Sequence, residues 1–172
     1  TNGDVIVFTT DDELWHTEPE PEGSDLLSSA KHAVKRVFGD ILGIGPTTGH
    51  TLVKRVIAVE GQTVSCCDGS GRVLVDGAAL EEPYVYDDLP FAPGALDCDS
   101  LPVSTRCFGE VTVPEGMMLV LGDHRAMSSD GIAECRGSPE ADADCVRWVR
   151  REDVVGEVFS VVWPLNRFGG LP

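Results

Sequence analysis

The sequence predicts a mainly β protein that carries one amphipathic helix. Short runs rich in Val, Ile and Leu alternate with loops, and 19 Gly and 11 Pro supply frequent turn signals. Apolar residues recur at three- and four-residue spacing in residues 24–42, which is the spacing of one helix face. A length of 172 residues suits one hydrophobic core with a modest insert.

Several segments have the apolar, β-branched composition of strands. They are residues 5–8, 51–59, 62–65, 72–75, 117–121 and 154–163. Asp76-Gly77 is a tight hairpin signal, and the stretch from Tyr84 to Arg106 is irregular. We therefore expect a β core made of residues 1–61 and 113–172, with residues 62–112 inserted as a small β subdomain.

The expected helix begins near Ser24 or Asp25, which can cap its first turn, and ends before Gly43. Its polar face is basic and carries Lys31, His32, Lys35 and Arg36. A helix with an apolar stripe and a basic face can lie on an anionic membrane surface. It can equally pack the stripe on the protein's own core and leave the basic face in water. The sequence leaves both alternatives open.

The chain is strongly acidic, with 29 Asp and Glu against 13 Lys and Arg and a net charge of −16. Nucleic-acid binding needs a positive footprint, so this composition argues against nucleic acid as a partner. The sequence contains no run of 18 apolar residues, so it predicts no membrane span. It does not begin like a signal peptide but enters a strand at once, as though it were cut from a longer protein.

Six cysteines lie in loop-like, acidic surroundings, which favours disulfides and an extracytoplasmic location. They lack the Cys-x-x-Cys pattern and the nearby histidines of a zinc site, so we expect no metal. Cys135 and Cys145 bracket an acidic loop and form the most natural pair.

The other cysteines leave alternatives open. Cys107 is expected to pair with Cys66 or Cys67, and Cys98 would take the other one or stay unpaired. Free thiols in a cytosolic protein are the competing interpretation of all six.

A lysine stands in the middle of the expected strand 51–59. Strand alternation places Leu52, Lys54, Val56 and Ala58 on one face and Val53, Arg55, Ile57 and Val59 on the other. Each face is apolar apart from one cation, so we expect the strand to be covered on both sides. Burial disfavours the charged amine and lowers its pKa, which would make Lys54 a possible general base. Alternatively, its alkyl stem packs on the strand while the ammonium reaches water.

A second concentration of reactive side chains follows the strand 117–121. The loop from Gly122 to Asp130 combines charges and hydroxyl groups in a short stretch. Loops that are held by a rigid sheet are common places for catalytic groups. The alternative is a turn whose Asp, Ser and Arg side chains bond their own backbone.

In their order along the chain, these stretches resemble bacterial type I signal peptidase. The resemblance rests on Gly3 to Phe8, on Lys54 to Gln62, and on Val113-Pro114-Glu115-Gly116 followed by Gly122-Asp123-His124-Arg125-x-x-Ser128-x-Asp130. It covers nearly the whole chain and leaves mainly the first loop, the helix and the insert as variable parts.

The resemblance implies a signal-peptidase-like β core and a serine endopeptidase with a Ser/Lys dyad and no cofactor. Lys54 would be the general base, and Ser128 would hold its amine by a hydrogen bond. The polar scaffold under the site would consist of Arg55, Asp123, Arg125 and Asp130. Leu52 and Val53 fall where the family binds its substrate, an extended signal peptide of an exported preprotein.

The resemblance also implies a location at the extracytoplasmic face of the cell membrane, anchored through a segment missing from this chain. The family's nucleophile block, of the type Ser-Met-x-Pro, would lie upstream of Gly3. We therefore expect the attacking serine to lie outside these 172 residues and the fragment by itself to be inactive.

Two further departures from the family affect the site. Family members commonly have Asp-Ser-Arg where this chain has Asp130-Gly131-Ile132, so Asp130 lacks its usual Arg neighbour. Arg136 or Arg125 could substitute for it. Family members also often have Asn where this chain has Met127.

Two other interpretations compete with this one. A self-cleaving repressor-type protease domain uses the same Ser-Lys chemistry, but its cytosolic setting fits poorly with six cysteines and a charge of −16. A disulfide-stapled extracellular binding module would keep Lys54 as a structural residue. A solvent-exposed Lys54 with an ordinary pKa would favour that module.

Overall fold

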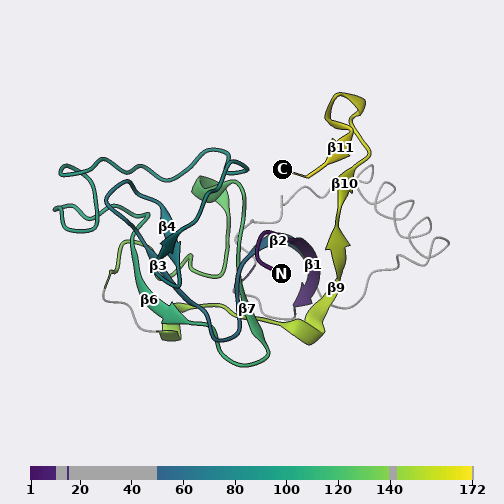
Figure 1. Cartoon of the computed structure of the whole chain (residues 1–172), viewed down its shortest axis with the longest axis horizontal. Helices are drawn as coiled ribbons and strands as arrows, with labels where there is room; N and C mark the ends of the chain where they lie inside the picture. Colours follow the sequence, from purple (N-terminus) through teal and green to yellow (C-terminus); the bar gives the residue numbers. More distant parts are fainter. Residues whose placement is uncertain (11–14, 16–49, 140–142, 172) are drawn as a thin grey trace, which may run out of the picture.

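A computed structural model describes residues 1–10, 15, 50–139 and 143–171 (Figure 1). The expected helix over residues 24–42, with its basic face of Lys31, His32, Lys35 and Arg36, lies outside the described residues. Within the described ranges, strands dominate and the helical elements are short 3₁₀ turns. In the same ranges, no helix has the length and apolar character needed to cross a membrane. The mainly β class is confirmed.

The larger sheet is antiparallel and has the strand order β8-β7-β2-β1-β9. Its strands are β1 (Val5–Thr10), β2 (His50–Val59), β7 (Met117–Leu121), β8 (Val149–Arg150) and β9 (Val154–Val158). The central strand β2 pairs with β1 along its first half and with β7 along its second half. This arrangement leaves one edge of the first half of β2 without a strand partner among the described residues.

A second antiparallel sheet, ordered β5-β4-β3-β6, is formed within residues 62–112. Its strands are β3 (Thr63–Cys66), β4 (Val73–Val75), β5 (Ala78–Ala79) and β6 (Phe108–Thr112). Ser160–Val161 (β10) and Gly169–Gly170 (β11) pair in a separate hairpin. The expected strand over 154–163 is therefore two strands, β9 and β10. In Figure 1 the second sheet and this hairpin lie on opposite sides of the larger sheet.

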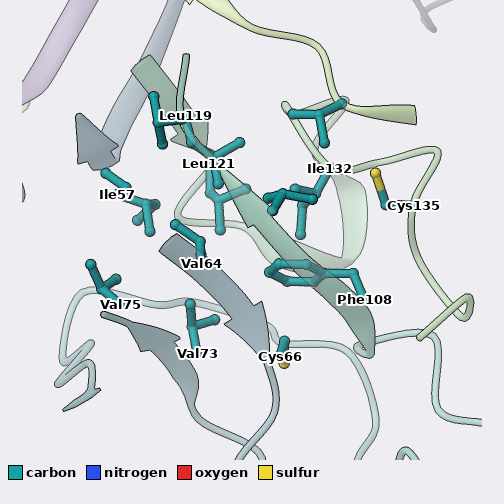
Figure 2. Close-up of a cluster of buried hydrophobic side chains, with 14 residues drawn as sticks. Ile57, Val64, Cys66, Val73, Val75, Phe108, Leu119, Leu121, Ile132 and Cys135 are labelled. Atoms are coloured by element: carbon teal, nitrogen blue, oxygen red, sulfur yellow. The ribbon is translucent and has the colours of Figure 1, made fainter. Parts of the chain in front are cut away.

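The two sheets share one hydrophobic cluster. Ile57 of β2 and Leu119 and Leu121 of β7 pack with Val64 and Phe108 of the second sheet (Figure 2). All of these side chains are almost completely buried. Apolar burial on this scale is the main favourable term in folding, so the second sheet is held to the larger one by their common core.

A β-bulge changes the expected alternation of side chains between the two faces of β2. The register with β7 shifts between Val56 and Ala58. An extra residue in one strand reverses the direction of the side chains beyond it. Ala58 therefore packs in the same cluster as Ile57, while Val59 packs against the other cluster together with Val56. The expectation that Ala58 shares a face with Val56 is wrong.

The disulfides differ in part from those expected. Cys135 is joined to Cys145, as the sequence predicted. Cys66, however, is joined to its neighbour Cys67, and Cys107 is joined to Cys98.

Local folding explains why the expected Cys107 pairing is wrong. The backbone N–H of Ser104 donates to the carbonyl of Asp97, and that of Cys107 donates to the carbonyl of Ser104. These turns return the chain so that the Cα atoms of Cys98 and Cys107 lie 5.5 Å apart, within the range a disulfide spans.

Removing the Cys135–Cys145 disulfide should lower the stability of the protein. The bond joins residues 10 apart in sequence, and the chain-entropy account assigns such a closure about 3 kcal/mol. In urea unfolding, a Cys135→Ala/Cys145→Ala variant should have a lower midpoint than the parent protein. Equal midpoints with equal slopes would contradict the prediction.

Candidate active site

The fold brings Lys54 and Ser128 together across 74 residues of sequence. Lys54 lies on β2, opposite Ile6 of β1, and Ser128 follows the 3₁₀ turn Arg125–Met127 in the loop after β7. The Lys54 Nζ donates a hydrogen bond of 2.6 Å to the Ser128 Oγ. The geometry is the one the sequence predicted for this pair.

Gly122 makes this close approach possible. A Cβ atom at position 122 would lie 2.0 Å from the Ser128 Oγ and 2.6 Å from its Cβ. Both distances are far below van der Waals contact, so a larger residue would displace Ser128. In the sequence, Gly122 stands out only as part of a motif, because the clash depends on where the loop returns in the folded chain.

Arg125 fixes the shape of this loop from inside. Its side chain is buried, and its Nε donates a hydrogen bond of 3.0 Å to the carbonyl of Gly122. Arg125 also opens a 3₁₀ turn, Arg125–Met127 (η2), that leads the chain to Ser128. The guanidinium therefore holds the segment against which Ser128 packs.

The environment of Lys54 favours a neutral amine. Burial lowers the pKa of Lys54 below its ordinary value, and the charge of Asp130 opposes this effect in part. A lysine with a lowered pKa can accept a proton near neutral pH, as a general base must. The alternative in which the ammonium reaches bulk water does not agree with this partly buried position.

Arg55, the next residue on β2, is buried and forms a separate ion pair with Asp123, whose side chain is partly exposed. Its Nε and Nη2 donate to the two carboxylate oxygens of Asp123 at 2.9 and 2.8 Å, and its Nη1 donates to the carbonyl of Gly3. The bonds to Asp123 raise the pKa of Arg55 in spite of burial. This fork ties the start of the loop to β2 and to the chain's first turn.

A small hollow opens beside Lys54. It has a volume of about 160 Å³ and is lined by Val5, Val53, Lys54, Arg55 and Asp123. The Val53 side chain is 55% exposed, so the expectation that both faces of the strand are covered is wrong in its first half. Val53 belongs to neither of the hydrophobic clusters found among the described residues, so no apolar layer there covers its face of the strand. Leu52 is half-buried and packs against the core instead.

Comparison with known proteins identifies the family. The chain matches the family described as signal peptidase, peptidase S26, over residues 1–163. The protein belongs to the signal peptidase family. It is thereby homologous to the serine endopeptidases called signal peptidase I.

Individual relatives cover nearly the whole chain. A probable signal peptidase I of Mycobacterium leprae is 36% identical over 98% of this chain, and signal peptidase I of Mycobacterium tuberculosis is 37% identical over 97%. The chain spans 57% and 53% of the lengths of these two relatives. A crystal structure of signal peptidase I from Enterococcus faecalis matches with a TM-score of 0.43 and 21% identity, covering 92% of this chain and 95% of that chain.

The structure decides between the partners considered for Asp130 in this signal peptidase family member. The Asp130 side chain is completely buried, and its Oδ2 accepts a hydrogen bond of 2.8 Å from the Nη2 of Arg136. Burial raises the pKa of Asp130, and the charge of Arg136 opposes that rise. Ile132, where the family commonly has Arg, packs in the hydrophobic cluster. Arg136 thus supplies the cation from a different position.

Two charged or polar residues near the site were missed by the sequence analysis. Glu82 bonds Arg125, and the Tyr84 ring lies under the guanidinium of Arg55, with 3.8 Å between the Arg55 Cζ and the ring centroid. Both lie between β5 and β6, inside the expected insert 62–112, and Tyr84 begins the part of it that is expected to be irregular. No spacing rule connects that stretch to the loop after β7, so the sequence offered no signal for them.

Gly122→Ala should destabilise the protein, because the added Cβ overlaps Ser128. Overpacking of this kind costs about 1–3 kcal/mol. Urea unfolding measures the loss, and Gly156→Ala is the matched control because nothing lies within 4 Å of a Cβ at that position. Equal unfolding midpoints for the two variants would argue against a close fit at Gly122.

Lys54→Met should stabilise the protein in a manner that depends on pH. The folded pKa of Lys54 lies below the 10.5 expected for the unfolded chain, so the folded state resists protonation. The gain should be full below the folded pKa and should vanish as the pH rises toward 10.5. Denaturant unfolding at several pH values measures it. A gain that does not change with pH would mean that Lys54 titrates normally in the folded protein.

Proposed function

We propose that this chain is the extracytoplasmic domain of a signal peptidase that removes signal peptides from exported preproteins. Lys54 acts as the general base, and the attacking serine is supplied from upstream of Thr1. The observation that carries the proposal is the hydrogen bond of 2.6 Å between the Lys54 Nζ and the Ser128 Oγ in a partly buried setting. The family membership of the chain supports the choice of reaction.

The proposed mechanism depends on how a neutral amine is oriented. A neutral lysine has two N–H donors and one lone pair. When the amine donates one N–H to Ser128, rotation about the Cε–Nζ bond of Lys54 is restricted. The lone pair can then point at the hydroxyl of the attacking serine, which is a different residue from Ser128. The hydroxyl proton moves to the Nζ as the serine oxygen attacks the peptide carbonyl. The same proton then passes to the leaving amine, and the regenerated base activates the water that hydrolyses the acyl-enzyme.

The proposed substrate is an extended peptide that pairs with the first half of β2. Residues 51–54 have β1 on one side, and β7 reaches only to Arg55 on the other. A free strand edge recognises extended peptides through main-chain hydrogen bonds, and adjacent hollows select side chains. Leu52 would contribute backbone bonds and Val53 the wall of the hollow beside Lys54. A volume of about 160 Å³ suits small side chains near the cleaved bond.

The proposed location is the extracytoplasmic face of the cell membrane. Six cysteines joined in pairs fit an oxidising compartment. Contact of residues 24–42 with an anionic membrane surface remains a prediction from their basic side chains.

Peptide cleavage tests the proposal. The 172-residue chain and a longer natural form that includes the upstream segment are each incubated with a preprotein signal-peptide substrate. The longer form should cleave, the shorter one should not exceed buffer, and Lys54→Met should abolish cleavage. In the longer form, Ser128→Ala should slow the reaction by about 100-fold because the base loses its orientation.

Ser129→Ala is the matched control. This neighbouring hydroxyl accepts a hydrogen bond from the Nη1 of Arg147 and no bond from Lys54, so its removal should leave the rate unchanged. Turnover by the 172-residue chain that is lost in Ser128→Ala would instead make Ser128 the nucleophile. Absence of cleavage in every form would favour a binding module without catalysis.

A further inference from the structure

A buried ion pair connects the second sheet region to the loop that carries Ser128. The Arg125 Nη2 and Nη1 donate to the two carboxylate oxygens of Glu82 at 2.5 and 3.3 Å. The side chains are 3% and 7% exposed, respectively. Glu82 lies in the stretch between β5 and β6, 43 residues before Arg125. Separating these two side chains would leave each as an uncompensated charge in the interior of the protein. This cost keeps the two side chains together.

Further contacts fix the Glu82 carboxylate and the stretch that follows it. The Tyr84 hydroxyl donates to the Glu82 Oε1 at 3.2 Å. The backbone N–H of Tyr86 donates to the carbonyl of Asp123 at 2.8 Å, and that of Ala126 donates to the carbonyl of Asp87 at 3.0 Å. Residues 82–87 therefore run beside the first half of the loop and hold it at several points.

From Arg125 the connection continues to the reacting groups. The Arg125 Nε donates to the Gly122 carbonyl, and Gly122 lies so close to Ser128 that an added Cβ would stand 2.0 Å from its Oγ. Ser128 in turn accepts the hydrogen bond from Lys54. A shift of Arg125 would therefore be passed on to the position of Ser128.

We propose that Glu82 is a positioning residue of the active site: through Arg125 and Gly122 it sets where Ser128 holds the Lys54 amine. The effect of Glu82 on catalysis rests on the proposed function, whereas its effect on the position of Ser128 does not. The residues between β5 and β6 thereby belong to the working site rather than to a separate insert.

Several charged groups other than Glu82 lie around the Lys54 amine. Asp130, held by Arg136, acts on the amine through its charge. Arg55 and Asp123 share the hollow with Lys54 and pair with each other. The charge that shifts the pKa of Lys54 is that of Asp130, and Glu82 belongs to none of these pairs, so we expect removal of the Glu82 charge to act on Lys54 through the loop. A looser loop admits water to the amine and raises its pKa.

Glu82→Gln tests the proposal, with Glu81→Gln as the matched control. Glu81 is the preceding residue, but its side chain is 83% exposed and bonds Arg72 on the surface. The pKa of Lys54 is measured in the folded 172-residue chain by competitive labelling of amines and mass spectrometry. The chain contains just two other lysines, Lys31 and Lys35, which serve as internal references.

Glu82→Gln should raise the pKa of Lys54 by about one unit, while Glu81→Gln should leave it unchanged. In the longer form that cleaves signal peptide, Glu82→Gln should lower kcat about tenfold with little change in KM, because the substrate edge on β2 is untouched. The acid limb of its rate profile should move to higher pH together with the pKa of Lys54.

The pKa of Lys54 and the cleavage rate together distinguish failure of the proposed function from failure of the role proposed for Glu82. If no form cleaves, the proposed function fails, while the labelling of Lys54 still decides the role of Glu82. If Glu82→Gln does not fold, Glu82→Asp keeps the charge but shortens the reach to Arg125, and the same labelling applies. A folded Glu82 variant whose Lys54 titrates as in Glu81→Gln would overturn the inference.

Discussion

The site depends on one lysine amine that is held out of bulk water and against a hydroxyl group. Removing an ammonium from water is costly, so the amine gives up its proton more readily, and the bond to Ser128 gives it a direction. Both effects require the loop after β7 to stay in place against β2. The rest of the local structure can be understood as a set of constraints on that loop.

Among the described residues, three ion pairs that each have at least one buried member supply such constraints, and each ties the loop to a different part of the chain. Arg55 on β2 holds Asp123, Glu82 before β6 holds Arg125, and Arg136 after the loop holds Asp130. Buried ion pairs contribute little net stability compared with apolar residues, but losing one partner costs about 3–5 kcal/mol. Such pairs therefore penalise other loop conformations strongly, which suits a site that needs one arrangement.

The second sheet contributes to the site through two routes. Its apolar side chains share a core with Ile57, Leu119 and Leu121, which fixes its position relative to β2 and β7. The irregular stretch between β5 and β6 then reaches the loop through Glu82 and reaches Arg55 of β2 through Tyr84. The shared core sets the distance of the second sheet from β2 and β7. The polar contacts of Glu82 and Tyr84 set the positions of individual side chains near the site.

The sequence by itself determined the mainly β class, the Cys135–Cys145 pair and the meeting of Lys54 with Ser128. These features follow from local composition, from a short loop, or from an ordered set of motifs. The tertiary structure decided the bulge after Val56, the choice of Cys98 for Cys107, the choice of Arg136 for Asp130, and the contact of Glu82 with Arg125. The bulge and the Glu82–Arg125 contact join segments that are far apart in the sequence and lie side by side only after folding. The Cys98–Cys107 and Asp130–Arg136 pairs join residues 9 and 6 apart, and they depend on how the intervening turns return the chain, which composition and spacing do not specify.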